Sequence, residues 1–286
     1  MDTSILELAW ALSPYAICGE GNVSVRDDDS FWMKASGASL TNLGKTEMIA
    51  CKMTGVPFDS LGPKPSIETG FHAWILKEFE DINFVAHTHP AKTMQVLCSE
   101  QIYSFADHRL FPDQVVRNGA KSCVVPYAMP GKPLLEQIIK YVTIFVEEYQ
   151  YFPKLILLEN HGIITASSSH KECIASTMMC EKSAEIFIGS KVLGQTNFLT
   201  DDQVSEIQNV VGDFAETKLY ELVNDGIPSA FIISSSTIAP LIRSSKKCLS
   251  TSRSSSQTTL ICMIFLIRRQ SRTTGGRTLY RSIRSH

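Results

Sequence analysis

Short runs with a two-residue hydrophobic period alternate along this chain with longer runs of helical period. Residues 21–26 (GNVSVR) set valines against polar neighbours, as a half-buried strand does. Residues 64–79 change to helical spacing after a predicted helix cap at Ser66. Residues 82–90 and 155–166 return to strand-like runs, and the latter is broken only by a tight turn. Because strands joined by turns run antiparallel, this order predicts an α/β fold around a mixed sheet.

Other segments with helical spacing complete the predicted elements. The third of them is expected to begin near Pro133, since proline is favoured in a first helical turn. The predicted helices are residues 3–13, 91–99, 133–149, 170–190 and 201–223.

The charge of the chain changes abruptly after Asp225. Residues 1–225 contain all 29 acidic residues and 17 of the 27 basic ones, a formal charge of −12. Residues 226–286 contain 10 basic residues, 14 serines and no acidic residue, and they show no usable periodicity. We therefore assign the working domain to residues 1–225.

Three interpretations of the Ser/Arg-rich tail at 226–286 stay open. It is a basic arm for nucleic acid or an anionic membrane, a disordered extension, or a stretch translated from a shifted reading frame. Basic and aromatic residues do not alternate in it, so no nucleic-acid partner is expected.

Cysteine usage and hydropathy indicate a cytoplasmic location. The eight cysteines form no C-x-x-C pair and no regular framework, which suits reduced thiols. The N-terminus lacks a basic region followed by an apolar one, so no secretory signal is expected. The longest apolar stretch, residues 260–267, is too short to span a bilayer.

Three histidines stand where predicted strands end or turn. His87 and His89 in VAHTHP point to the same side of an extended chain, because side chains alternate along a strand. His161 lies in the turn of LLENHGIITA. Three imidazoles that leave one coordination position open are an arrangement used for catalytic zinc. Spacing alone leaves open whether the three meet or are ordinary buried histidines.

Glu68 and several small-residue loops are further candidates. Glu68 falls in a predicted first helical turn, where the helix dipole favours a carboxylate, and it is either an ordinary first-turn acid or a general base. His72 shares its helix face, and simple packing is the favoured interpretation of that histidine. Loops at 19–22, 35–39 and 64–66 can present backbone N–H groups to an anion, although such loops are also common connectors.

Taken in order, GNVSVR, KASGASL, KPSIETGFH, VAHTHP and LLENHGIITA resemble the class II aldolase/adducin family over about residues 5–190. Members of this family include fuculose-phosphate and rhamnulose-phosphate aldolases and ribulose-phosphate 4-epimerase. The order P-S-x-E, H-x-H-P and N-H-G carries the resemblance. It implies a three-layer α/β/α fold around a central, mainly antiparallel mixed sheet.

The resemblance also implies a set of site residues and an assembly. One zinc ion in each subunit would be held by His87, His89 and His161, and Glu68 would be the acid/base. A sugar phosphate would be the substrate, and the protein would be a homotetramer with sites at subunit interfaces. The implied phosphate pocket is lined by Gly21, Asn22, Ser36, Gly37 and Ser66.

The implied activity is that of a class II, metal-dependent aldehyde-lyase. It would reversibly cleave a ketose, in the form of a ketose 1-phosphate, into dihydroxyacetone phosphate and an aldehyde, with Glu68 moving the proton. The alternatives are a sugar-phosphate epimerase or dehydratase on the same scaffold, a non-catalytic adducin-like binding module, and a domain inactivated by loss of its C-terminal closure. The intact histidines and Glu68, where the epimerase typically has Asp, favour the aldolase.

Two features depart from the family pattern. Ile67 stands where P-S-S-E commonly has its second serine, so one phosphate contact is lost and the substrate would depend less on its phosphate. The family also closes a neighbouring site with a C-terminal segment that often carries a tyrosine acid. Tyr220 is a candidate for that acid by position alone.

Overall fold

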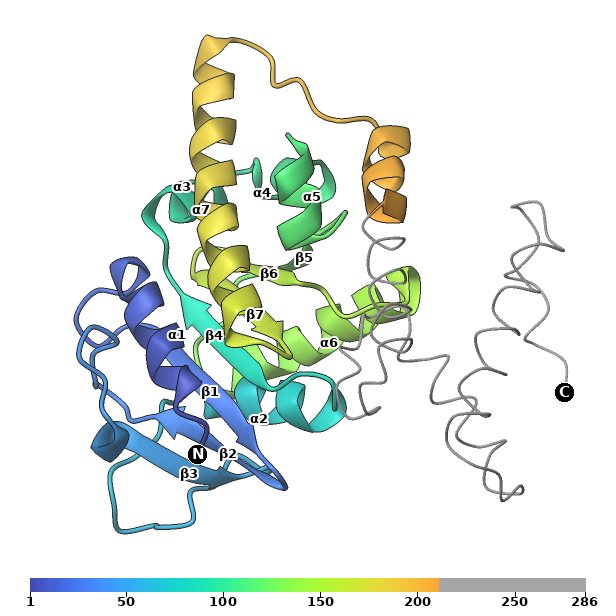
Figure 1. Ribbon diagram of the computed structural model, residues 1–286. Coiled ribbons are helices and arrows are strands. Elements are labelled where there is room, and N and C mark those ends of the chain that lie inside the picture. Colours follow the sequence, from blue (N-terminus) through green and yellow to red (C-terminus); the bar gives the residue numbers. More distant parts are fainter. Residues whose placement is uncertain (211–286) are drawn as a thin grey trace, which may run out of the picture. The chain divides into compact units, whose positions relative to one another are not determined.

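Seven strands form one mixed sheet in the order β3-β2-β1-β4-β7-β6-β5 (Figure 1). The computed structural model describes residues 1–210. Neighbouring strands are antiparallel except β5 and β6, which are parallel. The mainly antiparallel mixed sheet is therefore confirmed. The strands are β1 (Asn22–Asp27), β2 (Ser30–Lys34), β3 (Met48–Lys52), β4 (Phe84–Thr88), β5 (Cys123–Val125), β6 (Leu155–Leu158) and β7 (Gly162–Ser167).

The helices agree with five of the six predicted segments, and the sixth, from 201, is helical through residue 210, the last residue described. Pro133 lies in a first helical turn, as expected. Strands β3 and β5 and two short helices between residues 101 and 119 were not predicted. The helices are α1 (Ser4–Leu12), α2 (Thr69–Glu78), α3 (Ala91–Leu97), α4 (Ile102–Asp107), α5 (Pro112–Asn118), α6 (Lys132–Tyr149) and α7 (His170–Leu193), with 3-10 turns η1 (Ser13–Tyr15) and η2 (Lys45–Glu47).

Alternate side chains of the sheet enter two different cores, which makes the fold three-layered. On β6, Ile156 and Leu158 pack into the core that contains Phe71 of α2 and Ile138 of α6. Leu157, between them, packs on the opposite face into the core with residues of α3, α4 and α7. Helix α1 covers β1 and β4 in a further cluster. The predicted α/β/α layering is confirmed.

The central strand β4 pairs with β1 on one side and with β7 on the other. All five of its residues are buried. Its register sets His87 opposite Asn22 of β1 and opposite Ile164 of β7. The end of β4 therefore brings together segments from three distant parts of the sequence.

The start of α2 differs from the prediction. The cap residue is Glu68, not Ser66, and the helix begins at Thr69. The physical reason is a tight turn at residues 66–69, in which both the backbone N–H and the hydroxyl of Thr69 donate to the carbonyl oxygen of Ser66. The helix start is thereby delayed, and Glu68 lies just outside the first helical turn.

Several expectations concern residues that the structure does not describe. The end of the helix predicted at 201–223, Tyr220, the domain boundary at 225 and the tail at 226–286 all lie after residue 210. Within residues 1–210, none of the helices combines the length and apolarity needed to cross a bilayer.

The turn between β6 and β7 brings its residues against the end of β4. The backbone N–H of His161 donates to the carbonyl oxygen of Leu158 over 3.1 Å, and Asn160 adopts the left-handed φ of 52° that such a turn requires. A Cβ atom on Gly162 would lie 2.5 Å from Cδ2 of His89 and 2.7 Å from the carbonyl oxygen of Thr88. Glycine at 162 is what permits this approach.

We expect Gly162→Ala to destabilise the fold, because the added methyl group meets a backbone oxygen that cannot move away. The expected loss is about 1–3 kcal/mol, as for overpacked cores, measured by urea unfolding of the metal-free protein. Gly189→Ala is the matched control, since no atom lies within 4 Å of the added carbon. It should be neutral or stabilising by up to about 1 kcal/mol in helix α7. Equal effects of the two substitutions would contradict the steric argument.

Candidate metal centre

His87 presents one unprotonated ring nitrogen toward the site. Its Nδ1 lies 2.9 Å from the carbonyl oxygen of Ile163 on β7. A carbonyl only accepts, so Nδ1 donates and carries the proton. The Nε2 lone pair of this fully buried side chain is therefore free. Phe71 of α2 packs edge-on against the ring, with centroids 5.7 Å apart.

His89 faces His87 from the segment that follows β4. Its backbone N–H donates to the carbonyl oxygen of Tyr15 over 2.8 Å, which holds the main chain in place. The Nε2 atoms of His87 and His89 are 3.1 Å apart. The other ring nitrogen of His89, Nδ1, lies 3.4 Å from Oε2 of Glu20.

His161 completes the cluster from the β6–β7 turn. Its ring centroid lies 4.9 Å from that of His87 and 5.5 Å from that of His89. One nitrogen from each of the three rings lies within 4.8 Å of the others. The structure therefore brings together the three histidines whose convergence the sequence left open.

Glu68 approaches the same point from the start of α2. Its Oε1 lies 3.2 Å from Nε2 of His161, and its Oε2 lies 3.4 Å from Nε2 of His87. Oε2 also accepts a hydrogen bond of 2.9 Å from Nδ2 of Asn22. Oε1 is buried but has no aligned hydrogen bond. One carboxylate oxygen is thus held by a hydrogen bond, and the other lies beside His161 without an aligned hydrogen bond.

His72 is hydrogen-bonded to the site rather than merely packed. Its Nε2 donates to Oδ1 of Asn22, and its Nδ1 accepts from the hydroxyl of Ser24 over 2.7 Å. Since Oδ1 of Asn22 is taken by His72, Nδ2 is the group that faces Glu68. His72 therefore fixes which way the Asn22 amide points.

Three loops predicted to hold an anion lie next to one another. Nδ2 of Asn22 lies 3.3 Å from the hydroxyl of Ser66, and the backbone N–H of Ser36 donates to the carbonyl oxygen of Lys64 over 2.8 Å. A Cβ atom on Gly21 would lie 2.8 Å from the carbonyl oxygen of His87. No atom lies within 4 Å of the corresponding position on Gly37, so there is open space beside it.

Burial and charge together determine the protonation of the site. Burial opposes the charge of Glu68, but His87, His161 and Asn22 outweigh it and hold the pKa of Glu68 well below its usual range. Burial lowers the pKa of His87 to about 4, although Glu68 partly offsets this effect. Burial, with the nearby His161, also lowers the pKa of His89. An ionised carboxylate and neutral imidazoles are the states that bind metals.

The donor set fits a divalent cation. Nε2 of His87 and Nε2 of His89 lie 3.1 Å apart, and a nitrogen of His161 and the Oε1 atom of Glu68 lie beside them. A cation placed among these atoms would be bound by a lone pair from each of the three rings. Imidazole nitrogens suit zinc and the later first-row transition metals.

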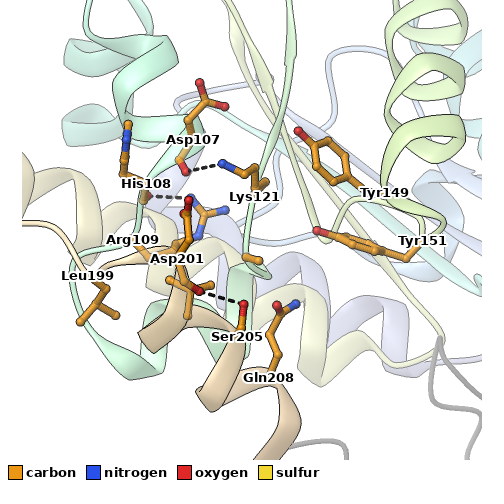
Figure 2. A pocket seen from close by; sticks show the side chains of 12 residues that line it. Asp107, His108, Arg109, Lys121, Tyr149, Tyr151, Leu199, Asp201, Ser205 and Gln208 are labelled. Atoms are coloured by element: carbon orange, nitrogen blue, oxygen red, sulfur yellow. Dashed lines mark hydrogen bonds between the residues drawn. The ribbon is translucent and has the colours of Figure 1, made fainter. Parts of the chain in front are cut away.

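A cavity of about 220 Å³ lies apart from the histidine cluster and shares no residue with it. Figure 2 shows Tyr149 and Tyr151 on one side of it, opposite the segment that carries Asp201 and Ser205. The buried Arg109 borders it, but the five oxygen atoms to which its guanidinium donates all belong to the surrounding chain. The guanidinium of Arg109 therefore stabilises the surrounding loops through these hydrogen bonds.

Comparison with known proteins decides the family. The model of the family described as "Class II Aldolase and Adducin N-terminal domain" matches residues 10–188. The chain belongs to this family.

Relatives of this class II aldolase domain carry out more than one reaction. A 3-oxo-tetronate 4-phosphate decarboxylase of Haemophilus influenzae is 27% identical over 199 residues, with 68% of this chain and 89% of the relative covered. An L-fuculose phosphate aldolase of Methanococcus maripaludis is 27% identical over 177 residues, with coverages of 60% and 86%. The solved structure of an L-fuculose 1-phosphate aldolase shares the fold, with a TM-score of 0.62 at 17% identity and coverages of 73% and 94%.

Two residues of this class II aldolase domain were missed by sequence reasoning. Glu20 faces His89, and the buried Lys34 donates from Nζ to the carbonyl oxygens of Gly19 and Ala38, which joins two of the loops. Burial lowers the pKa of Lys34 to about 8 despite the nearby Glu68. Glu20 lies within the loop at residues 19–22, and Lys34 is the first residue of KASGASL, but neither side chain was given a role.

The buried His72 should make the stability of the domain depend on pH. Burial lowers its pKa from 6.5 to about 3, so between these values the unfolded chain binds a proton that the folded chain does not. Unfolding free energy should therefore fall as pH drops below 6.5, by about 1.4 kcal/mol per pH unit for one proton.

We expect His72→Gln to reduce the dependence of the unfolding free energy on pH by the contribution of about one proton. The measurement is urea unfolding of the metal-free protein at pH 7, 6 and 5. The same substitution at the exposed His108 is the control. An unchanged slope in His72→Gln would show that His72 takes up its proton in the folded protein.

Proposed function

We propose that residues 1–225 form a zinc-dependent class II aldehyde-lyase that acts on a phosphorylated ketose. The reaction is the reversible cleavage of a ketose 1-phosphate into dihydroxyacetone phosphate and an aldehyde. One observation carries the proposal: a buried carboxylate, Glu68, lies within 3.4 Å of two members of a three-histidine cluster. Membership of the class II aldolase/adducin family supports it.

His87, His89 and His161 are the proposed zinc ligands, with one ion in each subunit. Bound zinc would act as a Lewis acid toward the carbonyl of the substrate. The protonation of His87 supports this assignment, because its Nδ1 proton is committed to Ile163 and its Nε2 is left free to bind. Three protein ligands are the usual number in catalytic zinc sites.

Glu68 is the proposed acid/base, and Oε1 is the atom that we expect to move the proton. Oε2 is occupied by the hydrogen bond from Asn22, whereas Oε1 is buried without an aligned hydrogen bond. The low pKa keeps the carboxylate ionised, so it can take a proton from the carbon next to a polarised carbonyl. In the cleavage direction, Oε1 would first take up the proton that the substrate hydroxyl loses as the carbon–carbon bond breaks, and would then give a proton to the enediolate.

The three joined loops are the proposed phosphate pocket. The open space beside Gly37 and the hydroxyl of Ser66 support this assignment. Ile67 replaces a hydroxyl by an apolar side chain that is 71% exposed, so the pocket should depend less on the phosphate group. Gly21, Asn22 and Ser36 complete the proposed set.

We further propose a homotetramer in the cytoplasm. Ile67, Tyr127 and Met129 are all more than half exposed, at 71%, 54% and 63%. A Cβ atom on Gly131 would lie 3.9 Å from the carbonyl oxygen of Ile67, so this apolar rim borders the start of α2. An exposed apolar rim next to a site is consistent with a neighbouring subunit that covers it.

Decarboxylation of a 3-oxo acid phosphate is the second candidate reaction. The Haemophilus influenzae relative favours it, because that protein is named for this activity. Loss of carbon dioxide next to a carbonyl leaves the same kind of enediolate as aldol cleavage. Glu68 would then protonate it in the same way.

A substrate panel separates these candidates. The zinc-loaded full chain is incubated with ketose 1-phosphates and with 3-oxo acid phosphates, and the release of aldehyde and of carbon dioxide is measured. Aldehyde release supports the aldolase, and carbon dioxide release alone supports the decarboxylase. Stoichiometric zinc without either product would contradict both and support an inactive or binding-only domain.

Glu68→Gln should lower turnover by about 10²–10⁴-fold while zinc stays bound, because the amide cannot move the proton. Rates are measured with the substrate that the panel identifies, and zinc content by metal analysis. Glu78→Gln, at the exposed far end of α2, is the matched control. Near-normal turnover of Glu68→Gln would rule out this acid/base.

A further inference from the structure

Glu20 has its carboxylate fixed by its own turn. Its backbone N–H donates to the carbonyl oxygen of Ile17 over 3.0 Å, and the backbone N–H of Ile17 donates back to Oε2 of Glu20 over 3.1 Å. The side chain is therefore folded over residues 17–20. In this position Oε2 lies 3.4 Å from Nδ1 of His89.

The same segment also holds the backbone of His89. The N–H of His89 donates to the carbonyl oxygen of Tyr15, five residues before Glu20. Residues 15–20 thus contact both the main chain and the ring of one histidine. Glu20 lies on the Nδ1 side of that ring, whereas Nε2 faces His87.

A count of protons shows what Glu20 does to the ring. His87 Nε2 carries no proton, because Nδ1 donates to Ile163. A neutral His89 has one proton to place. If Nε2 carried it, the Nδ1 lone pair would face the carboxylate of Glu20. If Nδ1 carries it, both His89 contacts are satisfied once a cation lies against the two Nε2 lone pairs.

We propose that Glu20 is a positioning residue of the metal centre. It accepts the Nδ1 proton of His89 and so presents the Nε2 lone pair to a divalent cation. This inference rests on the proposed function, since it needs a metal at the histidine cluster. Glu20 does not itself bind the ion, because it lies on the far side of the ring.

Such a carboxylate affects metal affinity through orientation and basicity. A histidine ligand whose other nitrogen donates to a carboxylate is fixed in one tautomer and is a stronger base, and loss of this partner typically costs about 10–100-fold in metal affinity. The side chain of Glu20 is 47% exposed, so solvent screens its charge at longer range. Glu20 should therefore change metal affinity through its contact with His89 rather than through its charge at a distance.

Zinc affinity of the metal-free full chain, measured against a competing chelator, provides the first test. Glu20→Ala should bind zinc about 10–100-fold more weakly. Glu20→Gln should lose less, because its amide oxygen still accepts the proton. Glu7→Ala is the matched control, since it removes the same charge from another carboxylate–histidine pair, 3.2 Å from Nε2 of His170. His89→Ala removes a proposed zinc ligand and so tests whether zinc binds at the histidine cluster at all.

A spectroscopic readout separates positioning from simple charge. In the zinc-loaded protein, ¹H–¹⁵N spectra should show a protected Nδ1 proton on His89, and Glu20→Ala should lose it through exchange with solvent. The Nδ1 proton of His87, held by Ile163, is the internal control and should persist.

The outcomes separate this inference from the proposed function. Wild-type affinity in Glu20→Ala, together with weak binding in His89→Ala, would overturn the role of Glu20 alone. Weaker binding in Glu7→Ala to the same degree, or a persistent His89 Nδ1 proton in Glu20→Ala, would also overturn it. Unchanged zinc binding in both Glu20→Ala and His89→Ala would overturn the metal centre and this role with it.

Discussion

The buried negative charge of Glu68 is the constraint around which the site is organised. An ionised carboxylate is costly to bury unless it is paired or hydrogen-bonded. Here its partners come from three different strands or turns: Asn22 at the start of β1, His87 on β4 and His161 after β6. Each can reach Glu68 only when the sheet is assembled in its observed order. The charge and the sheet topology therefore require each other.

A chain of hydrogen bonds carries this order into the interior. The hydroxyl of Ser24 donates to His72, His72 donates to the amide oxygen of Asn22, and the amide nitrogen of Asn22 donates to Glu68. Each of these three hydrogen bonds has a defined donor and acceptor, because the amide oxygen of Asn22 and the carboxylate of Glu68 can only accept. His72, which is fully buried in α2, thus orients the Asn22 amide so that its Nδ2 donates to Oε2 of Glu68, whereas Oε1 has no aligned hydrogen bond.

Much of the fold could be predicted from the sequence, because the hydrophobic period distinguishes strands from helices. The shared face of His87 and His89 follows from strand alternation alone, and the turn at His161 follows from its glycine and flanking apolar runs. Short elements such as β5, with three residues, carry too little pattern to be recognised. The cap of α2 was wrong because propensity favoured Ser66, whereas the local turn placed Glu68 there.

Convergence could not be derived from period or propensity. That His161 meets His87 depends on the pairing of β4 with β7, and a pairing register is a tertiary property. Glu20 and Lys34 were missed for the same reason, since Glu20 contacts His89 and Lys34 donates to the carbonyl oxygen of Gly19, both from another part of the chain. The family resemblance named the three histidines together, and the geometry now gives a physical reason for their grouping.

The hydrogen bonds at the site join residues that are far apart in the chain: 46 residues separate Asn22 from Glu68, 48 separate Ser24 from His72, and 76 separate His87 from Ile163. Contacts of such long range require the intervening loops to close, which costs conformational entropy. Within residues 1–210, no single hairpin or helix contains all three histidines, because His87 and His89 lie at the end of β4 and His161 lies in the β6–β7 turn. A ligand that binds there would recognise only the completed domain, and its occupancy would report how much of the population is fully folded.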